Sequence, residues 1–138
     1  MLTNFLRALF FAYLIFLTAL LLCREPSDLI AVEMGLLRAL LSVAHLLSFA
    51  VLAVLALAPR WPLPRWVVIM ALAAYGGATE LLQTFVWGRT PDWVDWFQDL
   101  IGIAIGTALW WSAATAWDHW SQRQGPNRSH TSQGPQRP

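Results

Sequence analysis

Four apolar runs, each about as long as a membrane-spanning helix, make up most of this chain. They cover approximately residues 5–22, 36–58, 66–87 and 93–117. A helix needs about 20 predominantly apolar residues to cross the hydrocarbon core of a bilayer. The composition agrees, because 57% of the 138 residues are hydrophobic and only 12% are charged, whereas soluble domains carry more charge. The sequence therefore predicts an all-α integral membrane protein with four transmembrane helices.

The segments outside these runs predict where the domain begins and ends. The first run is interpreted as a retained span, because large Leu residues precede Cys23 where a signal-peptide cleavage site would need small ones. Pro-rich residues 59–65 break the second helix. Residues 121–138 are largely Gln, Pro, Gly, Ser and Arg, a composition typical of disorder. We expect a transmembrane domain over residues 1–120 and a disordered polar tail over residues 121–138.

The distribution of basic residues predicts the orientation in the membrane. All nine are Arg, and four spans would place six of them on the side of the two termini: Arg7, Arg60, Arg65, Arg123, Arg128 and Arg137. By the positive-inside rule, both termini are then cytoplasmic. Trp residues near the predicted ends of the spans form belts that support these boundaries. A net charge of +1 gives no indication of nucleic-acid binding.

A polar stripe interrupts the last two apolar runs. In the fourth run, five residues recur at steps of 3, 4, 3 and 4: Asp92, Asp95, Asp99, Gly102 and Gly106. In the third run, Gly76, Glu80 and Gln83 follow one another at steps of 4 and 3. These steps place each set on one face of a helix. Gly76, Gly102 and Gly106 would let another helix approach that face closely.

Three ionisable residues, His45, Glu80 and Asp99, lie at similar depths within three different runs. Because a charged side chain facing lipid costs about 2.5–3.5 kcal/mol, we expect these groups to face inward and to find partners. The hypothesis is a polar pocket that opens on the outer side of the membrane. Its members would be His45, Glu80, Gln83, Arg89, Asp95 and Asp99. Arg89 could pair with Glu80 or with Asp95.

Several of these residues also have a purely structural interpretation. His45 can be a hydrogen-bonded packing residue, and Glu80 with Gln83 can hold helices together. Arg89 can belong to a surface cluster of ion pairs, and Asp92 can be the N-cap of the fourth helix. Thr79 and Ser42 are expected to bond their own helix backbone.

The chain offers few signs of a particular catalytic chemistry. No Ser has a base at a diagnostic spacing, and no HExxH-type spacing indicates a metal site. Cys23 is the single cysteine, so an intrachain disulfide is excluded. The sequence therefore names no catalytic residue and predicts neither a metal nor a cofactor.

The spacing of these residues resembles that of the VanZ-like family of small bacterial membrane proteins. Family members carry a Glu, Gln, Arg, Asp, Asn and Gly at intervals matched here by Glu80, Gln83, Arg89, Asp95, Asp99 and Gly102. An earlier family element is similar to His45, Phe49 and Leu52. Two departures stand out. Asp99 replaces the family's Asn, and Leu40, Leu41 and Ser42 stand where the family often has charged residues before the His.

The resemblance implies a multi-pass protein of the bacterial plasma membrane with a role at the cell envelope, and the family's namesake is linked with low-level teicoplanin resistance. The first functional hypothesis is an outer-leaflet pocket that binds a membrane lipid or a lipid-linked cell-wall precursor. One alternative is a membrane enzyme that uses carboxylate or His acid–base chemistry on such a molecule. Another is a small proton-coupled transporter with Glu80 as the carrier, for which a homo-oligomer could supply the missing half of the pathway. A structural role for the polar groups is the remaining alternative.

Overall fold

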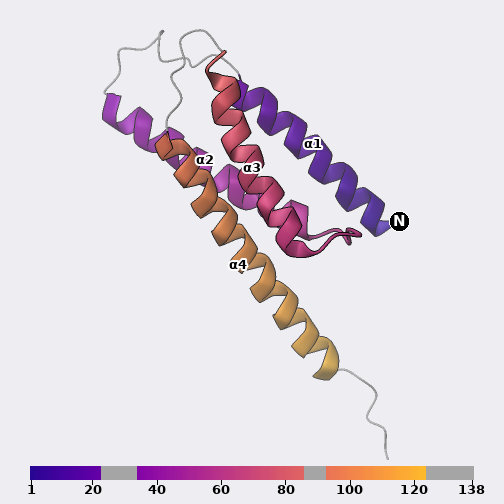
Figure 1. The fold of residues 1–138 in the computed structure, drawn as a ribbon. Helices are drawn as coiled ribbons and strands as arrows, with labels where there is room; N and C mark the ends of the chain where they lie inside the picture. Colours follow the sequence, from indigo (N-terminus) through magenta and orange to yellow (C-terminus); the bar gives the residue numbers. More distant parts are fainter. Residues whose placement is uncertain (23–33, 86–92, 124–138) are drawn as a thin grey trace, which may run out of the picture.

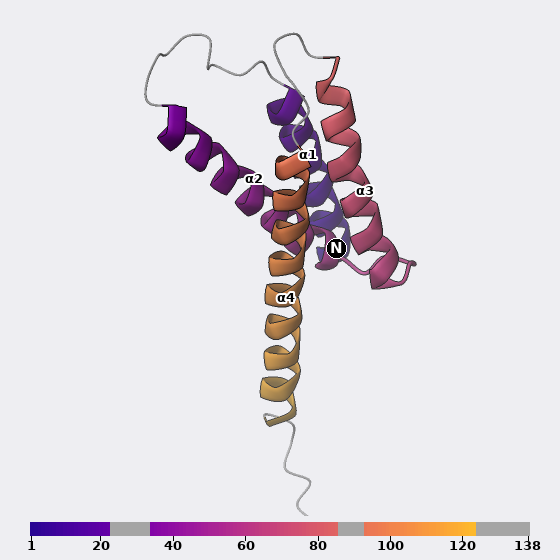
Figure 2. The same ribbon diagram turned by 60° about the vertical axis from the view of Figure 1, so that its left-hand side comes forward.

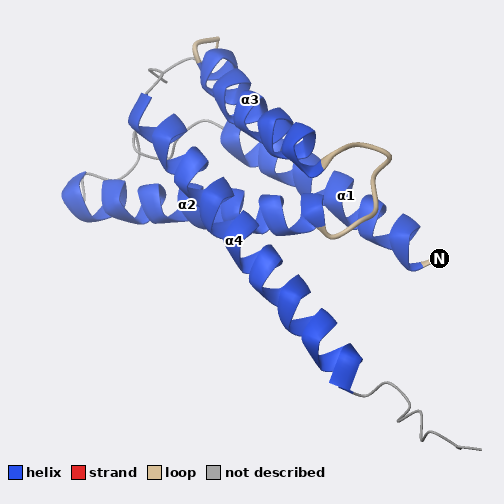
Figure 3. Ribbon diagram, turned by 60° about the horizontal axis from the view of Figure 1, so that its bottom comes forward, coloured by secondary structure: helices blue, strands red, loops and turns tan. Residues whose placement is uncertain are grey.

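The computed structural model describes residues 1–22, 34–85 and 93–123, with residues 34–39 and 41 described by their backbone alone. Four helices account for most of these residues: α1 (Leu2–Leu22), α2 (Met34–Leu57), α3 (Arg65–Gln83) and α4 (Trp93–Arg123). Within the described ranges there is no strand (Figure 3). The prediction of an all-α fold with four helices is confirmed.

Two helices end at positions that differ from the predicted ends of their apolar runs. Helix α3 ends at Gln83, after which the backbone N–H groups of Thr84 and Phe85 donate to the carbonyls of Leu81 and Leu82, respectively. Helix α4 continues past Trp117 to Arg123 and so includes the first three residues of the predicted tail. No Gly or Pro lies between Trp117 and Arg123, and therefore the helix persists after the sequence has become polar.

Three described helices, α1, α3 and α4, are long and apolar enough to cross a membrane. In α2 the described apolar segment, Ser42–Leu57, is shorter than a span, so the fourth crossing stays a prediction. The 31 residues of α4 extend about 46 Å, more than the roughly 30 Å of hydrocarbon in a bilayer. Its C-terminal part projects beyond the other helices (Figure 1).

Successive helices run in opposite directions, so the start of one helix lies at the same end of the bundle as the end of the next. Different residues therefore meet at the two ends of the bundle. Near the start of α1, Arg7 donates a hydrogen bond to the carbonyl of Arg60 in the connector between α2 and α3. At the opposite end, Gln83 near the end of α3 donates to the carbonyl of Leu21 near the end of α1, at 3.4 Å. Helix α4 starts at this second end, and its residue Asp99 lies next to Gly76 of α3.

The closest and most extensive packing is between α2 and α4, which cross obliquely (Figure 2). A Cβ atom at Gly102 would overlap the carbonyl oxygen of Leu46, and one at Gly106 would overlap the carbonyl oxygen of Ala50. The two backbones therefore touch, as in other helix pairs with small residues at the crossing. Phe49, Leu52 and other apolar residues form the core beside this contact. Many large apolar side chains on all four helices point outward, as expected for surfaces that face lipid.

Replacing Gly106 by Ile is expected to destabilise the fold by forcing α2 and α4 apart. Overpacking in a close contact typically costs about 1–3 kcal/mol, and here the obstructing atoms are backbone. Ala104→Ile is the matched control, because Ala104 is exposed on the same helix between the two glycines. Thermal unfolding in detergent should show a lower midpoint for Gly106→Ile and little change for Ala104→Ile. Equal midpoints for the two variants would contradict the backbone contact.

Candidate functional site

Three ionisable side chains from three helices meet inside the bundle. They are His45 of α2, Glu80 of α3 and Asp99 of α4, and we call them the polar cluster. One ligand-type atom of each lies within 4.8 Å of the other two. The residues are 8%, 4% and 0% exposed, respectively. The structure therefore brings together the three residues that the sequence placed at similar depth in separate apolar runs.

The glycines determine how closely these side chains approach. Gly102 lies one turn after Asp99, and its contact with the carbonyl of Leu46 holds α4 against the residue that follows His45. On α3, Gly76 lies one turn before Glu80. A Cβ atom at Gly76 would lie only 3.3 Å from Oδ2 of Asp99 and 3.4 Å from Cε1 of Phe49. A larger residue at position 76 would thus occupy the space of the Asp99 carboxylate.

Within the polar cluster, a hydrogen bond joins Nδ1 of His45 to Oδ1 of Asp99 at 3.3 Å. The other carboxylate oxygen of Asp99, Oδ2, is buried without a hydrogen-bond partner among the described residues. A buried polar atom of this kind costs free energy unless a further group satisfies it. The Asp99 carboxylate therefore has the capacity to accept one more donor.

The remaining predicted site residues do not all join the polar cluster. Gln83 is buried, and its amide contacts the carbonyl of Leu21, so it ties α3 to α1. Asp95 lies one turn before Asp99 in the first turn of α4 and is half-buried. Arg89 lies outside the described residues, and so do its predicted ion pairs with Glu80 and Asp95.

Two hydroxyl predictions have different outcomes. Thr79 bonds the carbonyl of Gly76 in its own helix at 2.7 Å, which confirms the expectation. Ser42 accepts a hydrogen bond from Gln98 of α4 at 3.2 Å, and because its own O–H can still donate, its expected bond to the backbone of its own helix stays a prediction. Sequence reasoning missed this second polar contact between α2 and α4. Ser42 lies three residues before His45 and so shares its face of α2, but Gln98 directly precedes Asp99, so no spacing within α4 indicated this contact.

Aromatic residues close off the polar cluster on the side of α3. The Tyr75 ring lies 5.9 Å from that of Phe49, and its hydroxyl shares a hydrogen bond with Thr18 of α1 at 2.8 Å. The indole of Trp96 covers Gly77 and donates to the carbonyl of Ala73. These contacts lie beside the polar cluster, whose three residues are all buried.

The polar cluster has a donor set that could also hold a divalent cation. One imidazole nitrogen and two carboxylates are ligands that Zn²⁺ and similar ions accept, at about 2.0–2.2 Å. Ligands at such distances from a tetrahedral ion lie roughly 3.4 Å apart. The His45–Asp99 separation of 3.3 Å matches this spacing, and the ligand atoms of all three residues lie within 4.8 Å of one another. No local motif could have indicated this set, because each ligand comes from a different helix.

The contact between His45 and Asp99 should appear as a coupling energy in a double-mutant cycle. Single and double replacements by Ala are expected to deviate from additivity by about 1–3 kcal/mol, because each single change leaves a buried partner unsatisfied. Ser42 and Gln98 provide the control cycle, since they form a neutral hydrogen bond between the same two helices. Unfolding free energies in detergent should give a smaller coupling for this neutral pair. Additive effects at His45 and Asp99 would show that the pair does not interact.

Comparison with known proteins assigns the chain to a family. The model of the VanZ/LLP1 family matches residues 5–115, which include all three members of the polar cluster and both glycines of the α2–α4 contact. No curated protein and no solved structure matches the chain. Because the family match extends over most of its length, this membrane protein belongs to the VanZ/LLP1 family.

Proposed function

We propose that this VanZ-like protein binds the headgroup of an envelope lipid, or of a lipid-linked cell-wall precursor, in the outer leaflet of the bacterial plasma membrane. The convergence of His45, Glu80 and Asp99 within 4.8 Å of one another is the observation that carries the proposal. Three ionisable groups in an apolar bundle are costly. Such groups in membrane proteins commonly mark a pathway or a binding site.

The chemistry of the cluster fits a polar headgroup. The buried Oδ2 of Asp99 can accept a hydrogen bond from a hydroxyl, amine or amide. In the proposal, Arg89 contacts a phosphate or carboxylate of the same ligand, because a guanidinium binds such groups through two parallel hydrogen bonds. Asp95 would orient Arg89 from the first turn of α4. A role in teicoplanin resistance stays a prediction from the family resemblance.

An acid–base enzyme is the second candidate, and the hydrogen bond between His45 and Asp99 favours it. A carboxylate bonded to one ring nitrogen fixes the orientation of an imidazole, whose other nitrogen can then move a proton. Glu80 is close enough to assist. In this case a lipid-linked substrate would be converted in vesicles and His45→Gln would stop the conversion. Unchanged substrate with the wild-type protein favours binding alone.

Lipids that co-purify with the protein provide the test of headgroup binding. Mass spectrometry should find one envelope lipid enriched with the wild type and reduced about 10-fold or more in Glu80→Gln and Arg89→Ala, since a hydrogen bond to a charged group contributes roughly 1.5–3 kcal/mol. Asp118→Asn and Arg123→Ala are the charge-matched controls at the far end of α4. They should retain the lipid. Equal enrichment in all variants, each with an unchanged unfolding midpoint, would contradict the proposal.

The proposed outer location of the polar cluster can be tested separately. In a Cys23→Ser background, a membrane-impermeant maleimide added to intact cells should label Thr90→Cys but not Pro64→Cys. Both cysteines should react after the cells are opened, which controls for accessibility. Labelling of Pro64→Cys alone would reverse the orientation and place the polar cluster near the cytoplasm.

A further inference from the structure

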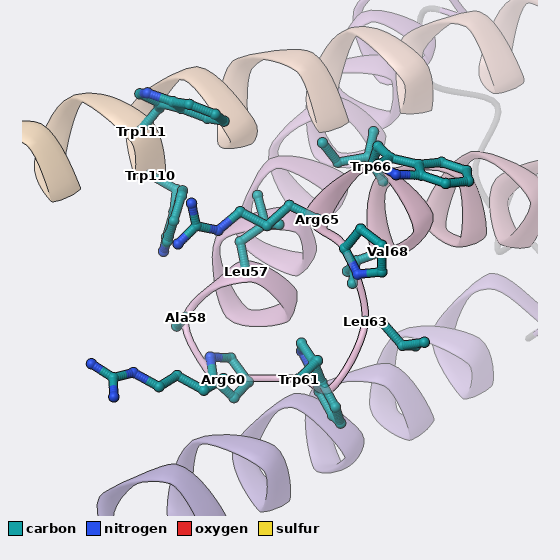
Figure 4. A pocket seen from close by; sticks show the side chains of 13 residues that line it. Leu57, Ala58, Arg60, Trp61, Leu63, Arg65, Trp66, Val68, Trp110 and Trp111 are labelled. Carbon is teal, nitrogen blue, oxygen red and sulfur yellow. The ribbon is translucent and has the colours of Figure 1, made fainter.

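A second site lies at the opposite end of the bundle from the polar cluster. The connector between α2 and α3 and the facing part of α4 form a pocket of about 840 Å³. Its polar and aromatic lining consists of Arg60, Trp61, Arg65, Trp66, Trp110 and Trp111 (Figure 4). From the sequence, Arg60 and Arg65 entered only the prediction of orientation, and Trp110 and Trp111 carried no prediction. In the folded protein, these Arg and Trp residues come from three segments and line one concave surface, which we call the Arg–Trp pocket.

The Arg–Trp pocket is rich in positive charge. The guanidinium of Arg65 lies 4.4 Å from the ring centre of Trp110 and 5.9 Å from that of Trp111. Arg7 lies 5.0 Å from the ring of Trp61 and donates to the carbonyl of Arg60, so a third guanidinium adjoins the pocket. Stacking on indole rings holds these flexible side chains in place. It also leaves the edges of the guanidinium groups available to an oxyanion.

No carboxylate balances this charge within the part of the chain that the structure describes. Glu80, Asp95 and Asp99 belong to the opposite end of the bundle, and Asp118 lies in the last turns of α4. The ion pair between His45 and Asp99 also lies at that opposite end. The Arg–Trp pocket therefore attracts anions, and an anion from outside the chain is the available counter-charge.

The backbone adds to this attraction. Helix α3 begins at Arg65, and its N-cap residue, Pro64, makes no side-chain capping hydrogen bond. Both residues line the pocket. The first-turn N–H groups of a helix and the positive end of its dipole favour a bound anion. Two Arg residues and the first residue of α3 thus line one cavity.

The surroundings of the pocket favour a lipid over a free ion. Trp66 and Trp111 are 66% and 51% exposed, as expected for aromatic residues at the level of lipid headgroups. Leu57, Val68 and Ile69 supply apolar walls beside the two Arg residues. A free phosphate would leave these walls in contact with water, whereas a phospholipid would cover them. Basic pockets between transmembrane helices bind anionic headgroups in this way.

We propose that the Arg–Trp pocket binds the phosphate headgroup of an anionic phospholipid, on the side of the membrane that holds the α2–α3 connector. Arg60 and Arg65 contact the phosphate, and the Trp rings pack against the glycerol and the first carbons of the acyl chains. This lipid site uses no residue of the polar cluster. Either proposal can therefore fail without affecting the other.

Native mass spectrometry of the detergent-purified full chain tests the proposal. Phosphatidylglycerol and phosphatidylcholine are titrated in parallel, and the wild type should bind the anionic lipid about 10-fold more tightly or better. Arg60→Gln/Arg65→Gln should lose roughly 25-fold in affinity for phosphatidylglycerol, at about fivefold for each Arg at the membrane surface. Arg123→Gln/Arg128→Gln removes the same net charge elsewhere and should remain within about twofold of the wild type.

Three results would overturn the proposal. Equal affinities of the wild type for the two lipids would show that the pocket does not select negative charge. Equal losses in the two double variants would show that only the net charge of the protein matters. Complete displacement of phosphatidylglycerol by millimolar inorganic phosphate would make the ligand a free anion. If Arg60→Gln/Arg65→Gln does not fold, Arg60→Lys/Arg65→Lys replaces it and should show a partial loss, because Lys keeps the charge but not the planar fork.

Discussion

The direct backbone contact between α2 and α4 is the interaction on which the rest of the structure depends. At Gly102 and Gly106 no Cβ atom separates α4 from the carbonyls of Leu46 and Ala50. In a bilayer, lipid is as apolar as the side chains, so helices associate through close packing and hydrogen bonds rather than through burial of apolar surface. This crossing positions Asp99 beside His45. Further along α4, it also places Trp110 and Trp111 over the connector between α2 and α3. Both candidate sites therefore rely on the same helix pair.

The two ends of the bundle carry opposite chemistry. One end holds the carboxylates of Glu80, Asp95 and Asp99, with His45 as their basic neighbour. The other holds Arg7, Arg60 and Arg65, stacked on or beside Trp rings. The ends also differ in exposure, because the three residues of the polar cluster are buried whereas Arg60, Arg65, Trp66 and Trp111 of the Arg–Trp pocket are exposed. An enclosed cluster suits recognition of a specific group, and an open basic pocket suits a lipid that is always present in the membrane.

Helical periodicity predicted the inward faces well. Gly76, Glu80 and Gln83 were placed on one face of α3 by steps of 4 and 3, and all three are buried. Of the five residues placed on one face of α4, Asp99, Gly102 and Gly106 are buried, Asp95 is half-buried, and Asp92 lies outside the described residues. The ends of the helices were less predictable, because the length of an apolar run indicates the part of a helix that contacts lipid and does not indicate where the helix itself ends. Helix α4 therefore extends to Arg123, beyond its predicted end near Trp117.

The sequence by itself determined that the protein is helical and that its helices are apolar enough for a membrane. It also determined which side chains face away from lipid. These properties follow from local rules, since apolar length, residue spacing and charge act within one helix. Only the tertiary structure decided which side chains meet. The pairing of His45 with Asp99, the contact of Ser42 with Gln98 and the gathering of Arg60, Arg65 and Trp110 join residues from different helices. Such contacts depend on the crossing angles of the helices and on the depth of each helix. Backbone contacts at Gly102 and Gly106 fix these quantities for α2 and α4, and the residue spacing within a single helix does not specify them.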